Sequence, residues 1–151
     1  FTTVNNGATD FDVTITPSAT TNSILIFGQV NVQLYNGGNN YGGSMRIQRS
    51  IAGGSTEDNF ASGNANGSRP RGSFWTSTMT NGYESVRSFF ITDKSHNTTS
   101  AITYKLQLIA HGNHTVYFNY HPNHGNGGNG YQSVGYSNII AQELGHTITD
   151  G

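Results

Sequence analysis

The sequence predicts an all-β protein, an antiparallel jelly-roll-like β-sandwich of about eight strands with long Gly/Asn-rich loops. Gly, Asn, Thr and Ser together supply 71 of the 151 residues, a composition that favours turns and strands over helices. Hydrophobic residues make up 33% of the chain, including eight Phe and eight Tyr, which suffices for a packed core and exceeds what a disordered linker contains. The third observation is the alternation of apolar and polar residues along many short segments.

The N-terminal strands follow from this period-two alternation. In 11–16 one face holds Phe11, Val13 and Ile15, and Pro17 ends the strand. The clearest strand is 24–34, whose apolar face is made of Ile24, Ile26, Val30, Val32 and Leu34. Gly28 falls on that apolar face, where it indicates a bend or the close approach of another backbone.

The middle of the chain predicts three further strands. In 45–51 the apolar positions are Met45, Ile47 and Ile51. Arg49 shares their face, so it is either paired or at the end of the strand. The segments 73–79 and 82–92 are interpreted as two strands joined near Asn81-Gly82, a sequence that predicts a hairpin.

The last strands are predicted at 101–110, 114–120 and about 134–144, and the sequence predicts no helix. Antiparallel strands in this number must close or stack to hide their edges, which favours a sandwich or jelly roll. The alternation places these side chains in the core: Ile26, Val30, Val32, Ile102, Leu106, Leu108, Val116 and Phe118.

Three predicted loops, 35–43, 52–72 and 121–133, are too long to be simple turns. Loops of this length commonly carry function. Loop 121–133 contains four glycines, which permit backbone conformations closed to other residues. We expect it to be exposed at an end of the sandwich and to contact a partner.

The charge of the chain and the length of its apolar stretches argue against nucleic-acid binding and membrane insertion. Seven Lys and Arg against eight Asp and Glu give a net charge of −1, without the basic patch that nucleic-acid binding requires. No apolar stretch approaches the roughly 20 residues that cross a bilayer as a helix, so membrane insertion is not expected. The chain has no cysteine. We interpret 1–151 as a single domain, and its opening on Phe1 predicts a processed or excised piece of a longer chain.

Catalytic signatures are weak. The eight acidic residues are scattered, and nothing in the sequence brings two together across a cleft as glycoside hydrolysis requires. Phosphate-binding loops, nucleophile elbows and zinc-protease motifs are missing from the sequence. We therefore predict that the protein is not an enzyme and has no catalytic residue.

Four histidines suggest a metal site, because neutral imidazoles bind zinc, nickel or iron. They are His111, His114, His121 and His124. The alternative is that these residues, in Gly/Asn-rich surroundings, are solvated and only form hydrogen bonds. The sequence otherwise implies no cofactor.

Aromatic and histidine side chains beside the Asn- and Gly-rich loops predict a recognition surface. Rigid aromatic groups offer contact area at low entropic cost, and Asn, Ser and Gly offer adaptable hydrogen bonds, a combination that suits sugars. The candidate glycan- or partner-binding residues are Tyr35, Tyr41, Trp75, His121, His124 and Tyr131. The alternative is that many of these aromatics simply pack on the sheets.

Several segments resemble the strand signatures of a family of marine phage virion proteins of the cyanophage and pelagiphage type. The matching segments are Thr16-Pro17-Ser18 with Ser23-Ile24-Leu25-Ile26, Met45-Arg46-Ile47-Gln48-Arg49, 89–93 with 98–107, 116–119 and 139–144. The resemblance covers about 11–144, nearly the whole chain. The chain departs from the family at 94–97, where family members have Ser-Pro, and in its His/Gly-rich segment 121–130.

The resemblance implies a tail-fibre, head-fibre or decoration domain on the virion surface, outside cells. We expect a tail-fibre-type adhesin that binds a cell-surface glycan and assembles as a homo-oligomer, most simply a trimer. The alternative is a purely structural capsid-decoration or filament subunit that contacts only itself and other virion proteins. The low share of charged residues, 10%, also favours self-association, because an exposed monomer surface would carry few charges.

Overall fold

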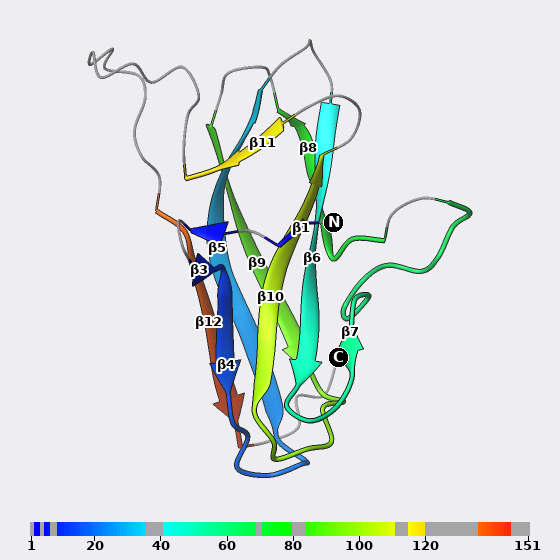
Figure 1. Cartoon of the computed structure of the whole chain (residues 1–151), viewed down its shortest axis with the longest axis vertical. Coiled ribbons are helices and arrows are strands. Elements are labelled where there is room, and N and C mark those ends of the chain that lie inside the picture. Colours follow the sequence, from blue (N-terminus) through cyan, green and yellow to red (C-terminus); the bar gives the residue numbers. More distant parts are fainter. Residues whose placement is uncertain are drawn as a thin grey trace.

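Strands form all the regular structure of the described residues in the computed structural model, which places 2–3, 5–6, 9–35, 41–68, 71–79, 84–110, 115–119 and 136–145 (Figure 1). Side chains are described for 11–32, 43–68, 71–74, 85–109, 117–119 and 136–145. The strands are β1 (Thr2–Thr3), β2 (Asn5–Asn6), β3 (Thr9–Asp10), β4 (Asp12–Ile15), β5 (Ser23–Tyr35), β6 (Tyr41–Ile51), β7 (Thr56–Glu57), β8 (Phe74–Met79), β9 (Glu84–Asp93), β10 (Ile102–Ala110), β11 (Thr115–Phe118) and β12 (Asn138–Leu144). Eight of them have four or more residues, which confirms the predicted strand number, and none of the described residues is helical.

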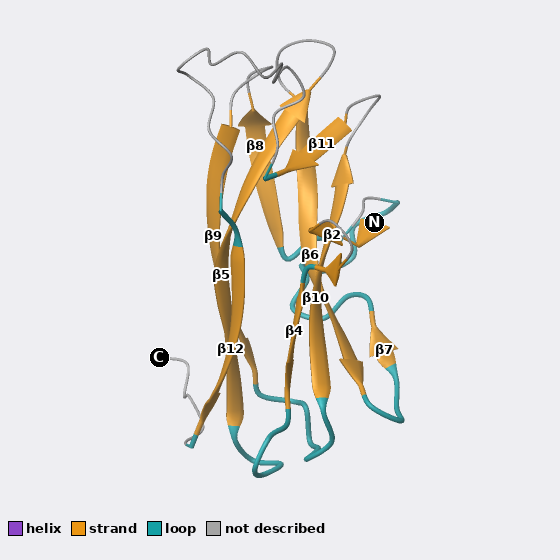
Figure 2. Ribbon diagram, turned by 60° about the vertical axis from the view of Figure 1, so that its left-hand side comes forward, coloured by secondary structure: helices purple, strands orange, loops and turns teal. Residues whose placement is uncertain are grey.

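Two antiparallel sheets face each other and confirm the predicted β-sandwich. In sheet I, β10 and β6 lie side by side; β1 and β4 pair with the outer edge of β10, and β7 and β8 pair with that of β6. In sheet II, β5 is central, with β9 along one edge and β11 and β12 along the other. Figure 2 shows the two layers beside each other, with β5, β9 and β12 on the left and β10 and β7 on the right. The short strands β2 and β3 pair only with each other in the described structure.

The chain crosses between the sheets at most of its connections. It passes from β4 to β5 to β6, and again from β8 through β9 and β10 to β11, changing sheet each time. The predicted hairpin of 73–79 and 82–92 is therefore wrong: β8 pairs with β6 in sheet I, whereas β9 pairs with β5 in sheet II. Asn-Gly signals a tight bend, but it does not say whether the next strand pairs or crosses over. The jelly-roll order of the strands stays a prediction.

The core lies between the two sheets and follows the predicted alternation. Its buried members include Ile26, Val30, Val32, Ile102 and Leu106, all at 0% exposure. Leu108 and Phe118 pack against this cluster while partly exposed. The side chain of Val116 lies outside the described residues. Across the sandwich, the rings of Phe74 on β8 and Phe89 on β9 stack with centroids 5.5 Å apart, so these two strands face each other through the core.

The predicted loops are shorter or better packed than expected where the structure describes them. The loop 35–43 is wrong at both ends, because Tyr35 ends β5 and β6 begins at Tyr41. The segment 52–72 contains β7, which pairs with β6, and the buried Phe60. Its aromatic ring anchors the segment to the core, so the described part of 52–72 is a cover over one side of sheet I. The loop 121–133 lies outside the described residues.

Gly28 confirms the close approach that its place on the apolar face predicted. A Cβ atom at this position would collide with the carbonyl oxygen of Asn138 and lie 3.1 Å from Cα of Ile139, both on β12. The neighbouring strand can take this path only because residue 28 has no side chain.

We predict that Gly28→Ala destabilises the fold by about 1–3 kcal/mol, the usual cost of forcing an extra methyl group into a filled space. Gly63→Ala is the matched control, because a Cβ there meets nothing within 4 Å. Urea unfolding followed by fluorescence measures both changes. Equal stability of the two variants would show that β12 can move away from β5 at no cost.

Candidate functional site

The predicted binding residues fall on parts of the chain where side chains are not described. The backbones of Tyr35, Tyr41 and Trp75 belong to β5, β6 and β8. The remaining candidates lie outside the described residues altogether: His111, His114, His121, His124 and Tyr131. The glycan-binding and metal-binding assignments of these residues therefore stay predictions.

Several of these segments start from the same end of the sandwich. Tyr35 pairs with Thr115, the first residue of β11, and Tyr41 pairs with Met79, the last residue of β8. Ala110, which precedes the segment with His111 and His114, pairs with Gly43. The register thus gathers the strand ends beside the predicted binding residues, at the top of Figure 1.

The strands β11 and β12 form one interrupted lane along the same edge of β5. β11 pairs with Val32–Tyr35 and runs antiparallel to β5, and β12 continues in the same direction along 23–29. Between the two, the chain leaves the sheet opposite Asn31 and returns after the segment 120–135. This segment, which includes His121, His124 and Tyr131, is therefore inserted into what would otherwise be a single strand.

Hydrogen bonds join the two ends of the insertion at Asn31. The Asn119 amide donates to the carbonyl oxygen of Asn31 at 3.0 Å, and the Asn31 amide donates to Oγ of Ser137 at 2.8 Å. The Ser137 hydroxyl in turn donates to Oδ1 of Asn119 at 2.5 Å. Asn119 has a positive φ of 55°, a conformation that Asn tolerates better than most residues and that turns the chain out of the sheet. The insertion therefore leaves the sandwich from a closed and fixed base.

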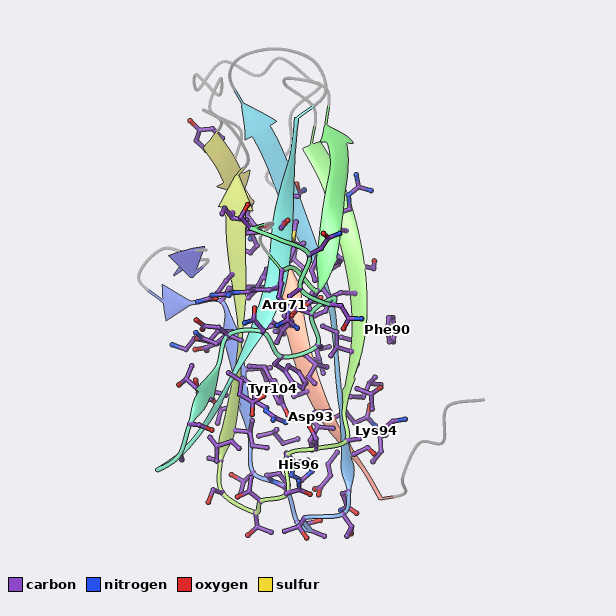
Figure 3. The ribbon with its side chains drawn as sticks, turned by 90° about the vertical axis from the view of Figure 1, so that its right-hand side faces the viewer. Arg71, Phe90, Asp93, Lys94, His96 and Tyr104 are labelled. Carbon is purple, nitrogen blue, oxygen red and sulfur yellow. The ribbon has the colours of Figure 1, made fainter. Side chains whose placement is uncertain are left out.

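A buried ionic cluster lies between the sheets, well away from the predicted binding residues. Nη1 of Arg49, on β6, donates to both carboxylate oxygens of Asp93, on β9, at 2.7 Å. Nη2 of Arg49 donates to Glu57 on β7 at 2.8 Å, and the Tyr104 hydroxyl on β10 donates to Asp93 at 2.8 Å. The guanidinium lies 4.8 Å from the ring centroid of Phe60. Figure 3 shows Asp93 and Tyr104 pointing toward each other inside the sandwich.

Two members of this cluster, Arg49 and Tyr104, keep their protons over the ordinary pH range. Burial alone would lower the pKa of Arg49, but its hydrogen bonds to Asp93 and Glu57 outweigh this and raise the pKa above its usual value. Burial, and then the neighbouring Asp93 carboxylate, raise the pKa of Tyr104 far above its usual value. The Tyr104 hydroxyl thus remains a hydrogen-bond donor. The cluster thus joins β6 and β10 of sheet I to β9 of sheet II through hydrogen bonds to Asp93.

A second polar cluster closes the opposite end of the sandwich. Oε1 of Glu143, at the end of β12, accepts hydrogen bonds from the amide of Ser18 at 2.7 Å and from Nδ2 of Asn22 at 2.8 Å. The hydrogen bond from Asn22, followed by those from Ser18, lowers the pKa of Glu143. The ring of His96 is 3% exposed, and its nitrogens lie 2.6 Å from the carbonyl oxygen of Asn22 and 3.0 Å from that of Thr98. His96, which belongs to the segment where the chain departs from the phage family, is thus a structural residue between two loops.

Metal chemistry finds no support among the residues that the structure describes. Within them, no three His, Asp or Glu side chains come close enough to hold a metal ion. The described part of the chain likewise contains no helix long and apolar enough to span a membrane.

Sequence reasoning found Arg49 but not its partners. Arg49 stood out because it interrupts an apolar face, and of the two explanations left open, pairing is confirmed. Asp93 and Tyr104 also occupy inward positions in the period-two alternation of their strands. An inward acid and an inward base could therefore have been predicted to pair. Glu57 gave no such signal, because it lies in a two-residue strand within the predicted loop 52–72.

Comparisons with known protein families, with curated proteins and with solved structures give no match to this chain.

We predict that Asp93→Asn destabilises the protein by about 3–5 kcal/mol, because it leaves the buried guanidinium without its main counter-charge. The matched control is Asp12→Asn, which removes a partly exposed acid 3.8 Å from Lys105 and should cost less than about 1 kcal/mol. Chemical denaturation measures both. Similar small losses for the two variants would show that the Arg49–Asp93 pair does not join the sheets.

We predict a pH-dependent contribution from Glu143. Since folding lowers the pKa of this group below its reference value of 4.5, its stabilising effect is present above that value and is lost as the pH falls through the folded pKa. Thermal melting should therefore show Glu143→Gln less stable than the wild type at pH 7, with a gap that narrows below about pH 4.5. Gln142→Ala, at the exposed neighbouring position, is the control and should show a gap independent of pH. A constant gap for Glu143→Gln would contradict the assignment.

Proposed function

We propose that this chain is a non-enzymatic domain of a virion surface or appendage, a tail-fibre-type adhesin that binds a cell-surface glycan. The phage resemblance supports the virion context, and the segments that carry it fall mainly on β5, β6, β9, β10, β11 and β12. These strands form the core and thus carry the architecture, which leaves recognition to the segments between them.

The observation that carries the recognition role is the interrupted lane of β11 and β12. The sheet continues on both sides of 120–135, and the hydrogen bonds of Asn119, Asn31 and Ser137 close the base of the insertion. The described strands thus pair with β5 on both sides of this segment. A long segment mounted on such a frame is typical of a binding loop.

The composition of the insertion fits sugar recognition. Its His121, His124 and Tyr131 offer flat rings for the apolar faces of pyranoses, and its asparagines offer paired donors and acceptors for hydroxyl groups. Tyr35 and Tyr41 lie on strand ends at the same end of the sandwich as the base of β11 and belong to the same proposed surface. Self-association would present several such surfaces together and raise avidity.

A second candidate is a structural subunit of a capsid decoration or filament with no receptor. The exposed apolar side chains on sheet II favour it, because a subunit that is covered by its neighbours needs such a surface. The two candidates differ in one measurable property: only the adhesin retains a saccharide by itself.

We predict that the wild-type domain binds a subset of bacterial surface saccharides on a glycan array. Replacing His121, His124 and Tyr131 together by Ala should weaken retention at least tenfold while the melting temperature stays almost unchanged. The control is Thr20→Ala with Thr99→Ala, two exposed residues of the loops at the other end, which should leave binding intact.

Two results would contradict this proposal. If the wild type retains no saccharide, the structural-subunit candidate takes its place. If the triple variant loses its melting temperature together with binding, the insertion is a packed element and its assignment as a recognition segment is wrong.

A further inference from the structure

The outer faces of the two sheets differ in character. Sheet I turns Arg46, Gln48 and Lys105 outward, and these side chains form ion pairs or hydrogen bonds with Asp58 and Asp12. Charged side chains and their partners therefore lie on this face. Sheet II instead exposes large hydrophobic side chains, among them Val86 at 56%, Phe90 at 73% and Ile140 at 41%.

The exposed apolar groups of sheet II form a row across its three lanes. Phe27, at the centre of β5, pairs with Phe90 on β9 and with Ile140 on β12. The rings of Phe27 and Phe90 stack with centroids 5.6 Å apart and planes 12° from parallel. Figure 3 shows Phe90 standing clear of the sheet, on the side away from the core. We call this row, with its outward neighbours, the outer apolar face.

The described outward side chains within β5, β9 and β12 carry no charge, and the exposed Lys94 lies directly beyond the end of β9. Inward residues of β5, β9 and β12 are buried in the core, so the alternate residues point outward. The outward residues with described side chains are Ser23, Leu25, Phe27, Gln29, Asn31, Val86, Ser88, Phe90, Thr92, Asn138, Ile140, Gln142 and Leu144, of which Ser23 and Asn31 are buried. Apolar, hydroxyl and amide groups alone form this part of the surface.

We propose that the outer apolar face packs against the same face of a second copy of this chain. Two identical uncharged faces meet without like-charge repulsion. A charged partner, by contrast, would find no group of opposite charge among these side chains. Apolar rows such as Phe27 and Phe90 can stack on their counterparts, as sheets do in sandwiches.

The size of the face fits a small interface between two copies. Three strands about 4.8 Å apart, over about seven residues of 3.4 Å each, give a flat area of roughly 340 Å². The flat areas of two copies sum to about 680 Å², and protruding rings such as Phe90 raise the accessible area buried toward roughly 1,000 Å², the lower limit for a specific interface. The contact is therefore reversible, and its population depends on protein concentration.

This inference rests only on the self-association part of the proposed function and is independent of glycan binding. It also specifies the contact, since a face that meets its own copy forms a twofold pair and not the trimer expected from the resemblance. Saccharide binding is measured on a glycan array and pairing by light scattering, and each is tested with different substitutions.

Light scattering of the purified chain from about 1 to about 500 μM tests the contact. Pairing through a small interface is expected to saturate within roughly this range of concentrations. The wild type should rise from its chain mass of 16.2 kDa toward twice that value. Phe90→Asp and Ser88→Asp each place a charge on the outer apolar face and should weaken pairing at least tenfold. The control is Thr14→Asp, an exposed strand position on the outer side of sheet I, which should pair like the wild type.

A cross-linking experiment keeps the test independent of stability. The chain has no cysteine, so Ser88→Cys carries the only thiol and should form disulfide-linked pairs under mild oxidation, whereas Thr14→Cys should not. A wild type that stays at its chain mass throughout the concentration range would overturn the proposal. So would a trimer, or a pair that Phe90→Asp and Ser88→Asp leave unchanged.

Discussion

The guanidinium group of Arg49 joins the two sheets and the segment that contains the short strand β7 at one point. It binds Asp93 of sheet II, shares that carboxylate with Tyr104 of sheet I, and holds Glu57 of the short strand β7. Moving a charge of this size out of water costs several kcal/mol, and only good geometry with several hydrogen bonds offsets that cost. These hydrogen bonds form only where Arg49, Asp93 and Tyr104 face one another, so the cluster favours the observed alignment of the two layers.

The alignment of the layers gives the outer features their positions. Once β5 is fixed against sheet I, its two edges determine where β9, β11 and β12 lie, and Gly28 lets β12 approach closely. The same strand therefore carries the inner core on one side and Phe27 on the other. Glu143, Asn22 and His96 tie the loops at the far end, so the two ends of the sandwich differ in kind: one is cross-linked by hydrogen bonds, and the other gathers the strand ends that lead to the proposed recognition segments.

Period-two alternation predicted the fold well because it reports which side chains face the core. It placed Ile26, Val30 and Leu106 correctly, and it marked Arg49 and Gly28 as exceptions that each required a partner or a close neighbour. Alternation does not report which strand pairs with which, since inward residues look alike in either sheet. For this reason β8 and β9 were predicted as a hairpin although they belong to opposite layers.

The candidate site was less accessible to sequence reasoning. The composition of 121–133 indicated a functional loop, but nothing in it indicated that the flanking strands share one lane, because that fact depends on long-range pairing with β5. The exposed row of Phe27, Phe90 and Ile140 was missed for a similar reason. Each of the three is an ordinary strand residue, and only the register brings them side by side.

The interruption between β11 and β12 also makes the length of the inserted segment largely independent of the pairing of the sheets. Its base is closed by Asn31, Asn119 and Ser137, so the length between these residues enters the stability of the fold mainly through loop-closure entropy. That entropy changes slowly, by about 0.6 kcal/mol for each doubling of the loop. A change in the length of 120–135, sixteen residues out of 151, therefore costs the pairing of β11 and β12 with β5 little through chain closure alone.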